Sequence, residues 1–447
     1  MDDNTADHVG ISSQVCKERQ STWSREFPSI NKGTFSISCV RDTPFNVVIR
    51  GVDSSGKFVT GYWIALAIRR NCASFLVNVN GKIQRVAKVT EQTQTKAIGY
   101  EAGRRITYWL SFDRDNKLLK FGKGYRMKET TLLKADFKKV AATNDVFNHM
   151  FFSSDNRKWI DQYDSANFTT NLERRSLDYG TAEVTFDSEP VTTNRSPIVR
   201  DSELANMFDI ERGCFTFSSD LPLPCQTLYN NVKASHMTIH SAGSPSEKNN
   251  LIDAIRRSIE SDEGVLHRKL LEKQEKSRGV FNEMYLRVTL GQNFGNSPGI
   301  PYVLEIWPKG HGSPIHSHGN AYGVIRVLHG GIRVHIYNND AMDRNQQPLT
   351  SFDAVKGDIT WLSPKWFQTH RLWNDTDDFC ATLQCYKYGE EDDTHCPYFE
   401  YVSKTNEIGQ FMPNSDFSFL EMYQLVMAEY QVKTKENNKK KHECTVM

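Results

Sequence analysis

The sequence lacks an apolar run long enough to cross a membrane as a helix, because no stretch of 18 consecutive apolar residues occurs. The first residues, Met1-Asp2-Asp3-Asn4, are polar and contain no hydrophobic segment of the kind that directs secretion. The nine cysteines are odd in number and show neither CxxC nor zinc-finger spacing. Together, these absences predict a reducing, intracellular compartment in which the thiols stay free.

An excess of charge of either sign is also missing. The 447 residues include 55 Lys and Arg against 54 Asp and Glu. Such a balance gives no global field that attracts nucleic acid, so we expect no nucleic-acid partner. The length itself predicts two or three domains.

Three histidines stand out between residues 310 and 374. His316 and His318 lie two residues apart in a segment of strand character, so both side chains point to the same face. His370 follows 52 residues after His318, in a second strand-rich segment. Three imidazoles that converge inside a small barrel would hold one divalent first-row metal and leave coordination positions open for a substrate and O2.

The intervals around these histidines are similar to the two sequence motifs of the cupins. The first motif comprises Gly310, His316, His318 and Gly330, and the second comprises Gly357, Pro364, His370 and Asn374. The second departs from the pattern by one residue on each side of Pro364, and Trp366 stands where a Gly is usual. Many cupins add a metal-binding Glu five residues after the second His, but Gly323 occupies that position, which leaves a three-His site.

Residues from about 250 to 430 resemble thiol dioxygenases of the cysteine dioxygenase family. The resemblance rests on Tyr285-Leu286-Arg287, the run from Gly310 to His318, His370-Arg371 and Tyr386. It implies Fe(II) held by three His, and oxidation of a small thiol to its sulfinate with both atoms of O2. Cysteine and 3-mercaptopropionate are the substrates it implies.

The resemblance also implies roles for individual residues. Arg287 would pair with the substrate carboxylate, and Tyr386 would act beside the iron. Gln384 stands where the family usually has a His that binds this tyrosine, and Thr382 replaces a Ser, so both are candidate substrate-binding residues. Gly323 takes the place of the Cys that animal enzymes cross-link to the tyrosine, so no thioether can form here.

The N-terminal part has the pattern of an antiparallel β-sandwich. Short alternating segments, separated by Gly, Asn and Asp, occupy 35–40, 46–50, 61–67, 74–79 and 106–112. The order of Gly61-Tyr62-Trp63-Ile64, Asn71 with Ser74, Tyr108-Trp109 and Phe121 to Gly124 resembles the farnesoic acid O-methyltransferase-like domain over about residues 30–140. No Gly-rich strand-turn-helix for a nucleotide-type cofactor occurs there, so we do not infer methyl transfer. Its aromatic residues fit a core better than a ligand site.

The rest of the chain divides into connecting and terminal segments. Residues 1–22 are polar and predict disorder. Residues 146–245 are expected to be a linker or irregular region, most clearly from Ser188 to Arg200. A helix is predicted after the capping box Ser244-Pro245-Ser246-Glu247, with Leu251, Ile252, Ile255 and Ile259 on one face. A second helix is expected from Phe417 to Tyr430.

The sequence ends in Cys444-Thr445-Val446-Met447, a C-a-a-X pattern that favours a farnesyl group on Cys444. The basic residues Lys439, Lys440 and Lys441 precede it in a polybasic tail at 432–447. One prenyl chain binds a membrane only marginally, and adjacent lysines supply the second attractive term. This pattern predicts attachment to the cytosolic face of a membrane.

The sequence therefore predicts a mainly β protein with an antiparallel β-sandwich at 23–145 and a cupin at 246–431, a small β-barrel or jelly roll with flanking helices. We expect an iron-dependent dioxygenase acting on a small thiol carboxylate. Two alternatives stay open. In the first, the cupin is a non-catalytic module of a membrane-tethered adaptor whose sandwich binds a protein or a glycan. In the second, it is a three-His enzyme that cleaves a carbon–carbon bond with O2.

Overall fold

The structure is a computed structural model of the chain. It describes residues 23–26, 32–40, 42–52, 58–79, 82–91, 97–103, 105–113, 115–138, 165–170, 183–234, 238–239, 250–277, 279–291, 302–319, 321–338, 344–388, 399–411 and 414–445. Side chains beyond residue 434 are not described. The predictions for residues 1–22 and for the capping box at 244–247 lie outside these ranges.

The chain divides into two compact units, Met1–Asn194 and Arg195–Met447. The division falls inside Ser188–Arg200, the segment whose composition predicts a linker. The wider range 146–245 differs from the expectation, because it supplies strands at 165–170 and 183–187 to the first unit, and strands and helices from Ile198 onward to the second. Such short strands carry too few alternating positions to be recognised by their pattern.

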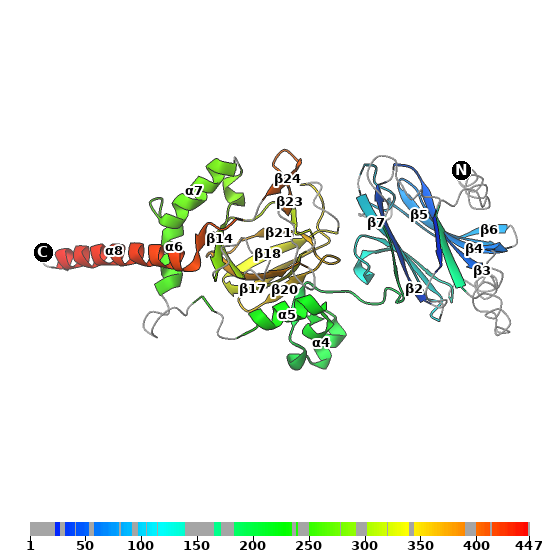
Figure 1. Cartoon of the computed structure of the whole chain (residues 1–447), viewed down its shortest axis with the longest axis horizontal. Helices are drawn as coiled ribbons and strands as arrows, with labels where there is room; N and C mark the ends of the chain where they lie inside the picture. Colours follow the sequence, from blue (N-terminus) through cyan, green and yellow to red (C-terminus); the bar gives the residue numbers. More distant parts are fainter. Residues whose placement is uncertain are drawn as a thin grey trace. The chain divides into compact units, whose positions relative to one another are not determined.

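The first unit contains two antiparallel sheets (Figure 1). The larger has the order β1 (Trp23–Glu26), β10 (Ser165–Thr170), β3 (Phe45–Val52), β4 (Phe58–Ile68), β5 (Cys72–Val79) and β6 (Lys82–Thr90). The smaller has the order β11 (Glu183–Asp187), β2 (Lys32–Val40), β7 (Arg105–Asp113), β8 (Leu118–Lys123) and β9 (Thr131–Asp136). All five segments predicted from alternation are strands of these sheets.

The main core of this unit lies between its two sheets. Val47 and Ile49 of β3 belong to the same buried cluster as Phe35 of β2, which is in the other sheet. Val48, the intervening residue, points to the opposite face and packs with Trp63 in a separate cluster. This alternation of faces is the reason why a period of two in the sequence predicts the strands.

The aromatic and glycine motif at 108–124 has a packing explanation. Gly122 of β8 lies opposite Trp109 of β7 in the strand register. A Cβ atom at Gly122 would approach the Trp109 ring to 2.1 Å and the Thr130 carbonyl oxygen to 2.4 Å. Trp109 itself is fully buried. Glycine is therefore required for the tryptophan to lie flat across the neighbouring strand, and the motif needs no ligand to account for it.

The second unit contains two further sheets, whose strands pair mainly in antiparallel fashion. Over the described residues, the two sheets do not close into a single barrel. The larger has the order β13 (Thr216–Phe217), β12 (Ile198–Arg200), β20 (Ile359–Leu362), β17 (Tyr322–His329), β22 (Cys380–Lys387), β15 (Tyr302–Trp307), β14 (Leu286–Leu290) and β25 (Phe417–Ser418). The smaller has the order β19 (Thr350–Val355), β18 (Gly331–Ile336), β21 (Thr369–Trp373), β16 (His316–Ser317), β23 (Phe399–Val402) and β24 (Ile408–Phe411).

Helices flank these sheets (Figure 1). They are α4 (Met207–Arg212), α5 (Leu223–Val232), α6 (Asn250–Glu260), α7 (Val265–Ser277) and α8 (Phe419–Thr445). The predicted leading helix is α6, whose Leu251 and Ile255 are buried as expected. Arg256 ties α6 to the sheets through two hydrogen bonds to Asp378, at 3.0 and 2.8 Å. The second predicted helix begins two residues later than expected and continues to Thr445.

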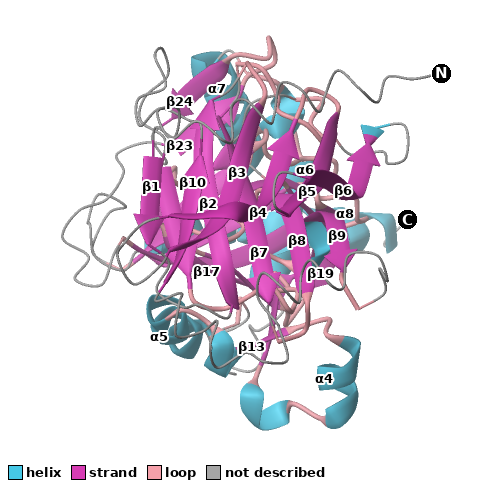
Figure 2. Ribbon diagram, turned by 90° about the vertical axis from the view of Figure 1, so that its right-hand side faces the viewer, coloured by secondary structure: helices cyan, strands magenta, loops and turns pink. Residues whose placement is uncertain are grey.

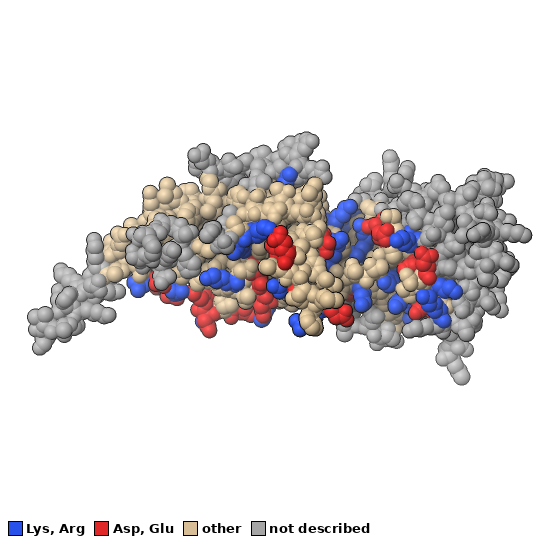
Figure 3. All heavy atoms as spheres, turned by 90° about the horizontal axis from the view of Figure 1, so that it is seen from below, with Lys and Arg blue, Asp and Glu red and all other residues tan. Residues whose placement is uncertain are grey.

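Strands make up most of the regular structure (Figure 2), so the chain is mainly β, as predicted. Among the described residues, no helix is both long and apolar enough to cross a bilayer. Basic and acidic side chains are interspersed on the face drawn in Figure 3.

Candidate metal centre

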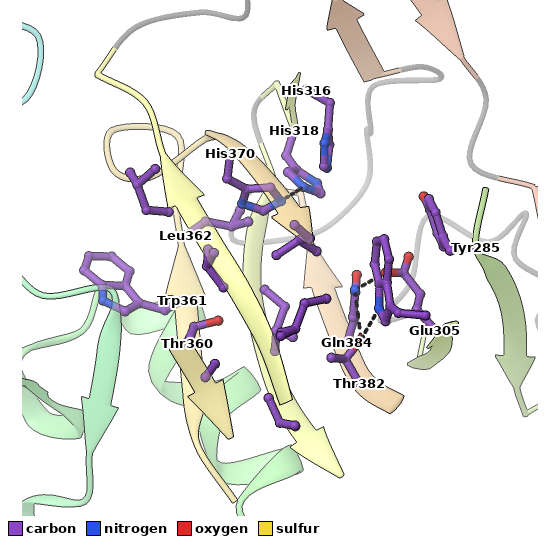
Figure 4. Close-up of a pocket in the computed structure, with 18 of the residues that line it drawn as sticks. Tyr285, Glu305, His316, His318, Thr360, Trp361, Leu362, His370, Thr382 and Gln384 are labelled. Atoms are coloured by element: carbon purple, nitrogen blue, oxygen red, sulfur yellow. Dashed lines mark hydrogen bonds between the residues drawn. The ribbon is translucent and has the colours of Figure 1, made fainter. Parts of the chain in front are cut away.

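The three histidines predicted as metal ligands lie together at the smaller sheet of the second unit (Figure 4). His316 in β16 is directly opposite His370 in β21, and His318 follows β16 by one residue. The ring centroids of the three pairs lie between 4.6 and 4.9 Å apart. Two residues of separation place His318 on the same face as His316, as the sequence predicts.

The segment before β16 is held tightly against β21, which fixes this register. A Cβ atom at Gly312 would meet the Leu372 carbonyl oxygen at 2.2 Å, so only glycine allows the two backbones to come this close. The next residue, Ser313, accepts a 3.0 Å hydrogen bond from the Leu372 backbone N–H through its hydroxyl oxygen. The Gly-His-Gly-Ser sequence therefore positions the histidines by bringing their strands together.

The nitrogen atoms of these rings fit a metal ion. One ligand atom from each His lies within 4.8 Å of the other two. The Nε2 atoms of His318 and His370 are 3.1 Å apart, and His318 Nδ1 is buried with no partner among the described residues. His316 Nδ1 lies 3.0 Å from the Pro314 carbonyl oxygen, to which it can donate, so its Nε2 is left with a free lone pair. A cation between the Nε2 atoms would replace the hydrogen bond that His318 and His370 otherwise form through them.

Burial keeps all three imidazoles neutral. It lowers the pKa of His316 to about 4, although the hydrogen bond to Pro314 opposes the shift. Burial, followed by the neighbouring histidines, lowers the pKa of His318 and of His370 well below the usual value. Neutral imidazole is the form that binds a metal, so no proton has to be removed near pH 7.

A second group of polar side chains lies in the larger sheet of this unit, on three neighbouring strands. Arg287 of β14 is in register with Glu305 of β15, and Glu305 is in register with Thr382 of β22. Gln384 and Tyr386 follow Thr382 at intervals of two along β22, and therefore share its face. The structure thus brings together all the residues predicted to bind substrate, and it adds Glu305.

Glu305 binds the arginine that the sequence assigns to a substrate carboxylate. Arg287 Nη1 donates to Glu305 Oε1 at 3.0 Å, and both side chains are less than 10% exposed. Burial raises the pKa of Glu305 to about 7, although Arg287 beside it acts in the opposite direction. The spacing of residues in the sequence did not reveal this pairing, because spacing does not specify which strands are neighbours. The available signal was a lone carboxylate within the apolar run Tyr302-Val-Leu-Glu-Ile-Trp307.

Gln384 connects this ion pair to Tyr386. Its Nε2 donates to Glu305 Oε2, and its Oε1 accepts a hydrogen bond from the Tyr386 hydroxyl. Gln384 therefore binds the tyrosine from the position where the resemblance places a His. Thr382 receives a 3.2 Å hydrogen bond from the Trp307 indole N–H.

Tyr386 links the polar group to the histidines. Its ring stacks on that of His318, with centroids 5.4 Å apart and an interplanar angle of 22°. Gly323 lies opposite Tyr386 in the register of β17 and β22, and a Cβ atom there would come within 2.9 Å of Tyr386 Cε1. The position is thus adjacent to the ring, but it carries no thiol for a cross-link. Burial raises the pKa of Tyr386 well above the usual value, so the hydroxyl stays protonated.

A cavity of about 30 Å³ extends between the two groups. Its lining includes the three histidines and Glu305 (Figure 4). Arg287, Tyr386 and several aliphatic and aromatic side chains also line it. Space of this size holds about one or two water molecules. The site is therefore suited to a small ligand rather than a large one.

No family model matches the chain. Solved structures that are similar to it include a cupin superfamily protein from Desulfitobacterium hafniense, at 13% identity and a TM-score of 0.18. That match covers 24% of this chain and 79% of the other. A protein of unassigned function from Klebsiella pneumoniae with a double-stranded β-helix domain matches at 16% identity and a TM-score of 0.21, over 28% and 83% of the two chains.

An oxalate oxidase in complex with the substrate analogue glycolate is also similar, at 16% identity and a TM-score of 0.20. The match covers 24% of this chain and 52% of the oxidase chain, about half its length. Similarity at this level carries no inference about activity. The chemistry of this chain is therefore argued from its own residues.

Proposed function

We propose that the protein is an iron-dependent dioxygenase that oxidises a small thiol to its sulfinate with O2. The observation that carries this proposal is the buried group of three neutral histidines beside a small cavity that also holds a tyrosine hydroxyl and an arginine. Fe(II) on His316, His318 and His370 would supply open positions at which a thiolate and O2 meet. Thiol and O2 combine with both oxygen atoms retained, and the sulfur supplies the electrons, so no further reductant is required.

The residues around the cavity have distinct roles in this proposal. Tyr386, oriented by Gln384, provides a hydrogen-bond donor close to His318. Arg287 uses Nη1 for Glu305, while its Nε is buried without a partner among the described residues. This unpaired N–H is a donor that the fork-like recognition of a carboxylate would use. The apolar walls limit the access of water.

Oxygen uptake against a panel of thiols tests this proposal. Protein loaded with one Fe(II) per chain is expected to consume O2 only when a small thiol is present, and to form sulfinate in equal amount. The panel comprises L-cysteine, 3-mercaptopropionate and cysteamine, with L-serine as the matched compound that lacks sulfur. Fully iron-loaded protein that takes up no O2 with any of these thiols would contradict the proposal.

We also propose that Cys444 carries a farnesyl group, where Met447 is the natural end of the chain, and that this group holds the protein at the cytosolic face of a membrane. The backbone of Cys444 lies near the end of α8. The lipid contributes about 0.8 kcal/mol per buried CH2, and each nearby lysine about 1 kcal/mol at an anionic surface. We expect intact-mass measurement from a eukaryotic host to show the prenyl mass and loss of 445–447. The matched variant Cys444→Ser is expected in the soluble fraction, and unmodified Cys444 in the natural chain would refute the proposal.

A further inference from the structure

Glu305 is an unusual residue for its position. It lies in the interior of β15, between Leu304 and Ile306, and is 3% exposed. Arg287 and Glu305 are the only charged side chains among the described residues that line the cavity. A buried carboxylate is costly unless it is paired and hydrogen-bonded, and replacement of such pairs by apolar residues is often neutral or stabilising. Packing alone therefore does not account for a carboxylate here.

The contacts of Glu305 define the charge that a substrate meets. One oxygen accepts from Arg287 and the other from Gln384, so the positive charge of Arg287 is largely balanced before any substrate arrives. A carboxylate that binds to the remaining edge of Arg287 lies close to the carboxylate of Glu305, and the two repel each other in a water-poor site. A cationic group on the same substrate offsets this repulsion.

We infer that Glu305 is a specificity-determining residue that selects thiols bearing a cationic amino group over thiols that bear only a carboxylate. The inference rests on the proposed function, because it names the substrate class of the same site. In a zwitterionic substrate, the ammonium group lies beside Glu305 and the carboxylate binds Arg287. Glu305 touches the substrate in this arrangement but takes no part in the oxidation.

L-Cysteine and 3-mercaptopropionate provide a matched pair for the test, because they differ only in the α-amino group. At pH 8 the Glu305 carboxyl, with its pKa of about 7, is mainly ionised. The natural protein is expected to favour L-cysteine in kcat/KM. Glu305→Gln removes the charge with little change of shape, and should shift the ratio of the two kcat/KM values towards 3-mercaptopropionate by about tenfold.

A second variant distinguishes the effect of the lost charge from the effect of a disrupted hydrogen-bond network. Glu305→Gln alone places two amide NH2 groups face to face, whereas the exchange Glu305→Gln with Gln384→Glu restores a donor for each acceptor and keeps the charge in the cavity. The exchanged protein is expected to retain more of the preference for L-cysteine than Glu305→Gln does. Equal ratios in the natural protein and in both variants, or a natural preference for 3-mercaptopropionate, would overturn the inference.

Binding without turnover separates this inference from the proposed function. Calorimetric titration of the Fe(II)-loaded protein with each of the two thiols, in the absence of O2, measures selectivity directly. A Glu305-dependent preference for L-cysteine in binding, with no oxygen uptake, would support the recognition and refute the dioxygenase. Turnover with no such preference in binding would support the dioxygenase and refute the role of Glu305.

Discussion

Simultaneous replacement of His316 and His318 by Ala is expected to reduce bound iron from one per chain to near zero. The change removes two of the three nitrogen ligands that lie within 4.8 Å of one another, and the remaining His370 alone cannot hold a labile divalent ion. Metal analysis of the purified protein after dialysis measures the effect. Thiol-dependent oxygen uptake should disappear in the same variant, because no metal remains to bring thiol and O2 together.

His335→Ala is the matched control for this experiment. Its side chain bonds to Ser351 at 2.7 Å and belongs to the same sheet, but it is not part of the three-His group. This variant should keep its iron. Iron at 100 times its dissociation constant should also stabilise the natural protein by about 2.7 kcal/mol, and the double variant not at all. Full iron content in the double variant would remove these histidines from the metal site.

The sequence was a good guide to the histidines, because the information that positions them is local. A separation of two residues fixes a shared face, and Gly312 and Ser313 beside them determine how closely β21 approaches. The interval to His370 then follows from the recurring motif. Within the first unit, the alternation of apolar residues was strong enough to identify five strands in the same way.

What the sequence could not give was the pairing of residues from distant strands. Arg287 and Glu305 are 18 residues apart, and only the register of β14 with β15 makes them neighbours. Gln384 likewise meets Glu305 only because β22 lies beside β15. The strands at 165–170 and 183–187 were missed, because segments of five or six residues carry little periodic signal. Cross-strand pairing determines which charged groups meet in the cavity, so the pairing of Glu305 with Arg287 could be recognised only from the structure.

Arg287→Lys is expected to raise KM for L-cysteine by roughly 30-fold or more, the order of magnitude for loss of a buried, hydrogen-bonded charge pair. Lysine keeps the positive charge but has no planar fork, so one ammonium group must serve both Glu305 and the substrate carboxylate. KM for cysteamine, which has no carboxylate, should change much less. Steady-state kinetics of oxygen uptake with the two thiols measures the difference.

Arg333→Lys serves as the matched control, because Arg333 pairs with Asp353 at the surface and is 42% exposed. It should leave both KM values unchanged. Iron content must also stay at one per chain in Arg287→Lys, since Arg287 is no ligand of the three-His group. Equal increases of KM for both thiols would mean that Arg287 acts only by holding Glu305 in place, and would exclude it from carboxylate recognition. An increase of KM for L-cysteine alone would support the view that Arg287 binds the carboxylate and Glu305 the ammonium group of one substrate.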